Sequence, residues 1–146
     1  MQHHLILRVV VKLLVSTIVL FALYVQFHGD YSPGGGFQAG VIMAAAFILY
    51  GLVFGLETVQ RVFPVWVVYR LLALGVLIFA GTGMLSLLLG FDYLDYDAFA
   101  PHHPSHGQHY GILAVEFGVG VTVTGVMVAI FYAFAQRPPQ VGDEDW

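Results

Sequence analysis

Apolar residues form four long runs along the chain, and most polar residues lie in the short segments between them. A helix needs about 20 apolar residues to cross the hydrocarbon core of a bilayer, which is about 30 Å thick. The runs lack the alternation of polar and apolar positions that strands of an outer-membrane barrel would show. The pattern therefore predicts an all-α integral membrane protein with four transmembrane helices, over about residues 5–27, 37–56, 65–90 and 110–135.

The composition agrees with one membrane domain over residues 1–135, followed by a short polar tail over residues 136–146. Of the 146 residues, 59% are hydrophobic and only 10% are charged, whereas about a quarter of the residues of a soluble domain are charged. The chain has no cysteine, which excludes disulfides, thiol nucleophiles and iron–sulfur ligation. Five Lys and Arg residues and a net charge of −4 leave no basic surface for nucleic acid.

The basic residues predict how the helices are oriented. The connections over residues 28–36 and 91–108 contain no Lys or Arg, so with four spans all five basic residues fall on one side of the membrane. Basic residues are enriched on the cytoplasmic side, and both termini and the tail are therefore predicted to be cytoplasmic. The first run begins with Arg8 and Lys12, as a signal peptide would, but no cleavage site of small residues follows it. We expect an uncleaved helix.

Small residues recur at helical spacing in the second and the fourth predicted helix. Such a stripe lets another helix backbone approach closely. The fourth helix has a further special side, which carries Glu116 and Gly120. Either the stripes only hold the four helices together, or the surplus of close-packing faces marks the chain as one part of a larger assembly. The stripes consist of Gly36, Gly40, Ala44, Gly51 and Gly55 in the second helix and of Gly111, Gly118, Thr122, Gly125 and Ala129 in the fourth.

A Gly-rich segment over residues 28–40, HGDYSPGGGFQAG, opens the second helix. Its glycines allow positive φ and leave backbone N–H groups exposed at the positive end of a helix. No Lys-Ser or Lys-Thr follows them, so the segment is not a P-loop. It is either a hairpin that lets two helices pack closely, or a docking surface or wall of an ion entrance for a neighbouring subunit. The candidate residues for this structural or docking motif are Pro33, Gly34, Gly35, Gly36, Phe37 and Gly40.

Glu116 is the only carboxylate within a predicted span, about two turns from the outer end of its helix. Ionisable residues within the bilayer cost at least a few kcal/mol and are functional candidates by default. A carboxyl group that is moved out of water holds its proton more tightly. Glu116 is therefore a candidate for proton or Na+ handling. Alternatively, a neighbouring helix caps it, or it pairs with a cation of a partner subunit.

Lys12 lies about two turns into the first helix. Its long side chain either reaches the membrane interface or pairs with a carboxylate of a partner subunit, and the same two interpretations apply to Arg70.

The outer connection is rich in histidine, with His102, His103, His106 and His109 in a run broken by prolines. Imidazoles ligate Zn2+ and Ni2+, but the prolines prevent one regular helical face and no acidic ligand is fixed nearby, so we predict no metal site. The histidines could instead sense pH. Together with the aspartates upstream, they could also attract cations to an external mouth.

The Pro33-Gly34-Gly35-Gly36-Phe37 sequence at the start of a second membrane helix, in a four-helix chain of this size, resembles the MnhB family, which are small subunits of the Mrp-type multisubunit sodium/proton antiporters. The resemblance runs from the first helix to the end of the fourth and includes residues 106–109, HGQH, and 115–120, VEFGVG. Many members have a His three residues before the Pro. This chain has Asp30 there, and its His28 lies two positions earlier.

The resemblance implies an accessory membrane subunit of a Na+/H+ antiporter that is driven by the proton motive force, in the cell membrane of a prokaryote. Its partners would be the lipid bilayer and the other subunits of the complex, including large complex-I-like subunits that carry the ion relays. The transported ions would be Na+ and H+, and no cofactor is implied. The candidates for the ion or proton pathway are Glu116, Lys12, His28, Asp30, His106 and His109.

Two other functions remain open from the sequence. The chain could be the homologous subunit of a membrane-bound hydrogenase or another redox-driven complex. It could also be an independent small transporter or channel, although four helices with one intramembrane carboxylate offer little for a complete alternating-access path. No catalytic motif is present, so we expect a transport subunit and not an enzyme.

Overall fold

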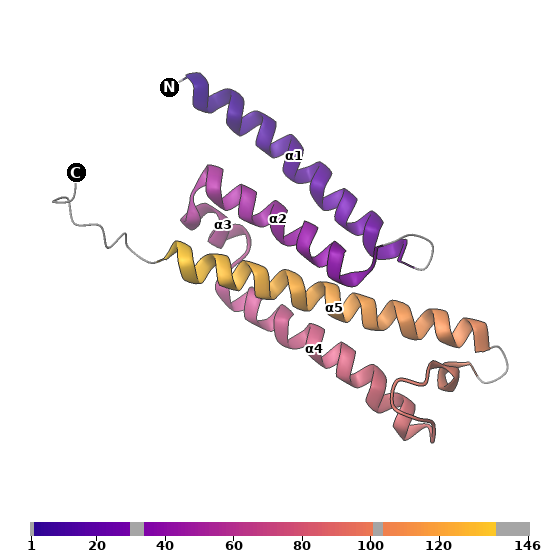
Figure 1. Cartoon of the computed structure of the whole chain (residues 1–146). Helices are drawn as coiled ribbons and strands as arrows, with labels where there is room; N and C mark the ends of the chain where they lie inside the picture. Colours follow the sequence, from indigo (N-terminus) through magenta and orange to yellow (C-terminus); the bar gives the residue numbers. More distant parts are fainter. Residues whose placement is uncertain (1, 30–33, 101–103, 137–146) are drawn as a thin grey trace, which may run out of the picture.

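The computed structural model describes residues 2–29, 34–100 and 104–136. Every regular element among them is a helix, and four of these helices are long and apolar enough to cross a membrane (Figure 1). The predicted all-α membrane fold with four spans is therefore confirmed. Asp30, Pro33, His102, His103 and nearly all of the C-terminal tail lie outside the described residues.

The four long helices are joined by two short ones. Between α2 and α4 lies the short helix α3, and between α4 and α5 lies the 3-10 helix η1. The bounds are Gln2–Phe27 for α1, Gly36–Phe54 for α2, Leu56–Val62 for α3, Val65–Leu88 for α4, Tyr96–Phe99 for η1 and Pro104–Ala135 for α5.

Two helix ends differ from the sequence prediction for identifiable reasons. Helix α2 ends at Phe54 and not at residue 56, because Gly55 has a φ of 94°, in the left-handed region that favours glycine. Helix α5 begins at Pro104 and not near residue 110. A backbone N–H at the first position of a helix has no partner within that helix, so a proline there costs no hydrogen bond. His106 and His109 therefore belong to the first turns of α5, and the connection between α4 and α5 is shorter than predicted.

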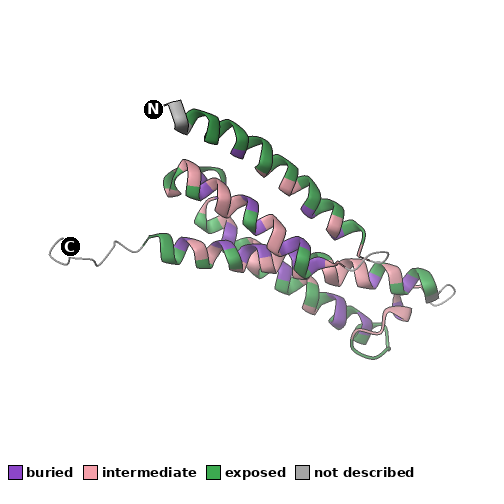
Figure 2. Ribbon diagram, turned by 45° about the horizontal axis from the view of Figure 1, so that its top comes forward, coloured by how far each residue is buried: buried purple, intermediate pink, exposed green. Residues whose placement is uncertain are grey.

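Helix α5 lies between α2 and α4, and α1 packs on α2 at the edge of the molecule (Figure 1). Figure 2 shows that α1 is exposed along most of its length, with Val11, Ala22 and Gln26 buried. Exposed apolar side chains are expected on a helix that faces lipid or another subunit.

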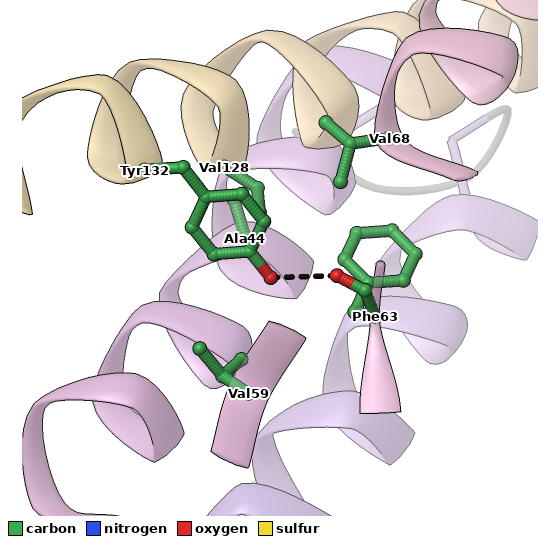
Figure 3. Packing of buried hydrophobic residues seen from close by; sticks show 6 residues of the cluster. All are labelled: Ala44, Val59, Phe63, Val68, Val128 and Tyr132. Carbon is green, nitrogen blue, oxygen red and sulfur yellow. Dashed lines mark hydrogen bonds between the residues drawn. The ribbon is translucent and has the colours of Figure 1, made fainter. Parts of the chain in front are cut away.

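The largest buried cluster lies where α3 folds back between α2 and the end of α5. Phe63 in this cluster stacks on Phe47 with ring centroids 4.4 Å apart. The hydroxyl of Tyr132 donates a hydrogen bond of 2.8 Å to the Phe63 carbonyl oxygen, so the buried phenol has a partner (Figure 3). The cluster consists of Ala44, Val59, Phe63, Val68, Val128 and Tyr132.

Glycines set the spacing between α5 and both of its neighbours. A Cβ atom on Gly40 of α2 would lie 2.7 Å from the Gly120 carbonyl oxygen, and one on Gly75 of α4 would lie 2.6 Å from the Gly118 carbonyl oxygen. Both distances are shorter than van der Waals contact. One small-residue side of α5 thus packs on α2 and another on α4, so both sides hold this chain's own helices together. Of the small residues that form the stripe of the second helix, only Gly55 lies outside the helix, because α2 ends at Phe54.

Candidate ion site at the start of helix α2

Glu116 and the Gly-rich segment form one site. The Glu116 carboxylate lies against Gly29, which follows α1, and against Gly35, which precedes α2. A Cβ atom on Gly35 would lie 2.5 Å from Glu116 Oε1, and one on Gly36 would overlap the carbonyl oxygen of Glu116 itself. Three glycines therefore make room for a single glutamate. Glu116 is half-buried in this contact.

The contact places Glu116 level with the first residue of α2. Helix α2 has 19 residues, about 28 Å at 1.5 Å per residue, which matches a hydrocarbon core of about 30 Å. Helix α2 is thus just long enough to cross the core, and Glu116 lies level with one of its ends. Because α5 begins earlier than predicted, Glu116 is about 18 Å from the start of its own helix, and the preceding turns of α5 extend beyond α2.

The backbone around the carboxylate is ordered by the beginning of α2. The Gly35 N–H donates to Gln38 Oε1 at 3.1 Å, and the Ala39 N–H donates to the Gly35 carbonyl oxygen at 3.0 Å. The first N–H groups of a helix carry partial positive charge and favour a nearby anion. The Glu116 carboxylate therefore lies beside the positive end of α2.

Two open hollows meet at Glu116 and Gly29. The larger has a volume of about 810 Å³, and its other lining residues are Ser105, His106, Gln108, His109 and Ile112. The smaller, of about 380 Å³, lies over the Gly-rich start of α2. The carboxylate is thus accessible from the polar side of α5 and from the Gly-rich segment.

The structure brings some of the pathway candidates together and separates one. His106 and His109 line the larger hollow with Glu116. His28 precedes Gly29; its Nδ1 lies 3.2 Å from the Tyr24 carbonyl oxygen, and its ring stacks on Tyr24 at 4.1 Å.

Lys12 lies at the other end of the helices, with its Nζ 5.7 Å from the centroid of the Phe54 ring. Asp30 lies outside the described residues.

The acidic segment near the histidines is fixed to α5. Asp97 Oδ1 accepts a hydrogen bond of 2.8 Å from Gln108 Nε2, and the Asp97 N–H donates to Asp95 Oδ1 at 3.1 Å. The ring of Tyr96 fills the space beside Gly111. Burial, and then the neighbouring Tyr93, raise the pKa of Tyr96 above its ordinary value. This segment supports the first turns of α5 and hence the two histidines on them.

Two polar residues near the site were not singled out from the sequence. Gln26 is only 7% exposed, and its Oε1 lies against Gly120, one turn below Glu116. Thr124 donates to the Gly120 carbonyl oxygen at 2.8 Å and to the Gly40 carbonyl oxygen at 3.2 Å. Gln26 could have been identified as the lone amide near the end of an otherwise apolar run. No sequence feature distinguishes Thr124 from the other small residues around it.

The fold and the site are those of a multi-pass membrane protein in which the Gly-rich start of one helix contacts a glutamate of another helix. Residues 6–129 match the sequence profile of the family described as "Domain related to MnhB subunit of Na+/H+ antiporter". The chain belongs to this family.

Relatives from two staphylococci agree with this assignment. The chain is 33% identical over 136 residues to the "Putative antiporter subunit mnhB2" of Staphylococcus haemolyticus strain JCSC1435, covering 92% of this chain and 96% of the relative. It is 32% identical over 137 residues to the protein of the same name from Staphylococcus aureus strain Newman, with the same coverage of 92% and 96%. The resemblance noted from the sequence is therefore confirmed.

Proposed function

We propose that the chain is an accessory membrane subunit of a multisubunit Na+/H+ antiporter in the plasma membrane of a prokaryote, and that Glu116 takes part in proton or Na+ transfer there. The family assignment supports the role as a subunit. The contact between the Glu116 carboxylate and the glycines at the start of α2 supports the role of Glu116. Large complex-I-like subunits would drive the exchange, since one intramembrane carboxylate is too little for a complete transport path.

The surroundings of Glu116 suit the transfer of a small cation. Its carboxylate borders two hollows, so a proton or Na+ can arrive through one and leave through the other. His106 and His109 line the larger hollow, where their imidazoles place further polar groups beside the carboxylate. The glycines beside the carboxylate present no side chain that would block its oxygens. Lys12 lies at the far end of α2, and we assign it no part in this transfer.

The role of Glu116 is tested with Glu116→Gln in the complete complex. Glutamine keeps the shape that packs against Gly29 and Gly35 but cannot bind or release a proton at physiological pH. In everted vesicles, we expect Na+-dependent proton exchange to fall at least about tenfold while the amount of assembled complex stays the same. Ordinary exchange rates at every pH in this variant would show that Glu116 only packs.

Glu57→Gln is the matched control. Glu57 is an exposed carboxylate on α3, at the opposite end of α2 from the site. Its loss removes the same charge from the chain but leaves the contact at Glu116 intact, so exchange should be unchanged. An equal loss of exchange in both variants would indicate an effect of net charge and would contradict the proposal.

The role as a subunit is tested separately by purification of the tagged full chain from native membranes in mild detergent. Recovery with large complex-I-like antiporter subunits is the expected result. Recovery with nickel–iron or iron–sulfur proteins would assign the chain to a redox-driven complex instead. If the chain purified without other proteins and still transported cations in vesicles, it would be an independent transporter.

A further inference from the structure

Two positive charges lie together at the end of α2 that is remote from Glu116. Arg8 and Lys12 are four residues apart on α1, and both reach the ring of Phe54 at the last residue of α2. Arg8 Cζ is 6.0 Å and Lys12 Nζ is 5.7 Å from the centroid of this ring. Within the described part of the chain, neither side chain forms an ion pair. Like charges four residues apart repel each other on a helix, and no counter-charge for this pair lies among the residues that the structure describes.

The pair lies at the depth of lipid headgroups. Phe54 is the last residue of a helix that is as long as the hydrocarbon core is thick, so its ring lies at a membrane boundary. The same end of the molecule carries Arg70, whose guanidinium lies 4.6 Å from the centroid of the Trp66 ring. Tryptophan beside a basic residue is typical of the interface between membrane and water. Phosphate groups are the abundant anions at this depth.

An apolar groove lies farther along α1 and α2, where these two helices meet α5. It has a volume of about 230 Å³ and is lined mainly by apolar side chains. At 100° per residue, Arg8 and Lys12 lie on the same face of α1 as the groove residues of that helix, and Phe54 lies on the same face of α2 as Met43 and Phe47. Along α1, Lys12 is about 15 Å and Arg8 about 21 Å from Ala22, the nearest groove residue of that helix, a distance that an extended acyl chain can span. The groove lining includes Ala22, Leu23 and Gln26 of α1, Met43 and Phe47 of α2, and Gly120 of α5.

We propose that α1 and α2 together bind one anionic phospholipid, with its phosphate between Arg8 and Lys12 and an acyl chain in the groove. Arg and Lys side chains supply several N–H donors to phosphate oxygens, and the phosphate would neutralise the two neighbouring positive charges. A transmembrane helix, about 10 Å across, is too wide for a hollow of 230 Å³. A single hydrocarbon chain suits both this volume and the apolar lining.

The proposal is tested by native mass spectrometry of the complete complex, delipidated in detergent and then incubated with phosphatidylglycerol, phosphatidylcholine or inorganic phosphate. The change is the double substitution R8Q/K12Q. We expect retention of phosphatidylglycerol to weaken by about 30-fold, roughly fivefold for each basic residue removed, with one lipid fewer per complex. R8K/K12R, which keeps both charges, should retain the lipid.

Two further variants separate this site from other effects. Arg61→Gln removes an exposed charge on α3 that does not contact Phe54, and the lipid should stay bound. Met43→Trp fills the groove without changing any charge, and retention of phosphatidylglycerol should fall. Neither Arg61 nor Met43 lines the two hollows at Glu116, so exchange at that site is read independently.

Several outcomes would overturn the proposal. Unchanged retention in R8Q/K12Q would show that the pair does not hold lipid, and an equal loss in Arg61→Gln would show an effect of net charge alone. Equal retention of phosphatidylcholine would contradict selection of an anionic headgroup. Displacement of the lipid by millimolar inorganic phosphate would indicate a site for free phosphate. Loss of a sister subunit from R8Q/K12Q, with lipid content unchanged, would show that a protein carboxylate binds there.

Discussion

The two ends of helix α2 meet the charged residues of neighbouring helices in different ways. At its start, the backbone of Gly36 lies directly against the backbone of Glu116, with no side chain between them. At its end, Arg8 and Lys12 of α1 reach Phe54 only with the tips of long side chains. Contact between backbones fixes a distance, whereas long side chains adjust to what lies between them.

This difference matches the chemistry that we assign to each end. A carboxylate that passes a small ion needs a fixed position, because charge interactions change steeply with distance. A site for a phospholipid headgroup needs reach and charge more than a fixed geometry. Substitutions at the start of α2 should therefore have large structural effects, and those at its end smaller ones.

The largest effect is expected from Gly36→Ala. The new Cβ would overlap the Glu116 carbonyl oxygen, and a backbone atom cannot move aside as a flexible side chain can. Overpacking of this kind costs about 1–3 kcal/mol, and we expect a value near the upper end. The measurement is SDS-induced unfolding of the purified full chain in mixed micelles, and assembly and exchange should fall as well.

Gly81→Ala on α4 is the control for Gly36→Ala. A Cβ atom on Gly81 meets nothing within 4 Å among the described residues, and alanine favours a helix over glycine by about 1 kcal/mol. The stability of the isolated chain should therefore stay the same or rise. If Gly36→Ala were as stable as Gly81→Ala, the close contact at the start of α2 would not exist.

The sequence predicted the helices better than it predicted their contacts. Length and hydropathy alone determine four spans, because a bilayer demands about 20 apolar residues for each. Two helix ends differ from the prediction. Gly55 adopts a positive φ and ends α2 early. Pro104 begins α5, whereas the prolines were expected to prevent one regular helical face for the histidines.

The candidate site was predicted in two separate pieces. The Gly-rich segment and Glu116 were both singled out, but 80 residues of chain separate Gly36 from Glu116, and a single sequence carries no signal for their contact. Gln26 was missed because one amide near a helix end is ordinary in composition. Lys12 was included among the pathway candidates for its charge, although the predicted orientation already separated it from Glu116, and the two lie at opposite ends of α2.

A moderate effect is expected at the end of α2 from Tyr132→Phe. This change removes the hydroxyl that donates to the Phe63 carbonyl oxygen at 2.8 Å, while the ring stays in the buried cluster. A lost hydrogen bond that leaves a buried partner unsatisfied costs about 1 kcal/mol, and the free energy of unfolding measured in SDS should fall by about this amount.

Tyr50→Phe is the control, because the Tyr50 ring stacks on Phe54 at 4.6 Å and no described residue forms a hydrogen bond with its hydroxyl. Equal shifts in the two variants would mean that the bond to Phe63 contributes nothing.

The smallest effect is expected from Thr124→Val, which tests whether hydrogen bonding adds to the backbone contact near the start of α2. Thr124 donates across the helix interface to the Gly40 carbonyl oxygen at 3.2 Å, and valine keeps the shape of threonine without this donor. Hydrogen bonds between membrane helices contribute about 0.6 kcal/mol on average, so the unfolding free energy should fall by about that amount.

Thr82→Val on α4 is the matched control, since the buried Thr82 hydroxyl donates only to Ile78 in its own helix, at 2.8 Å. A loss in Thr124→Val that exceeds the loss in Thr82→Val would show that this bond helps to join α2 to α5. Equal losses would show that this bond adds nothing to the close glycine contacts between α2 and α5, which Gly36→Ala disrupts at Glu116.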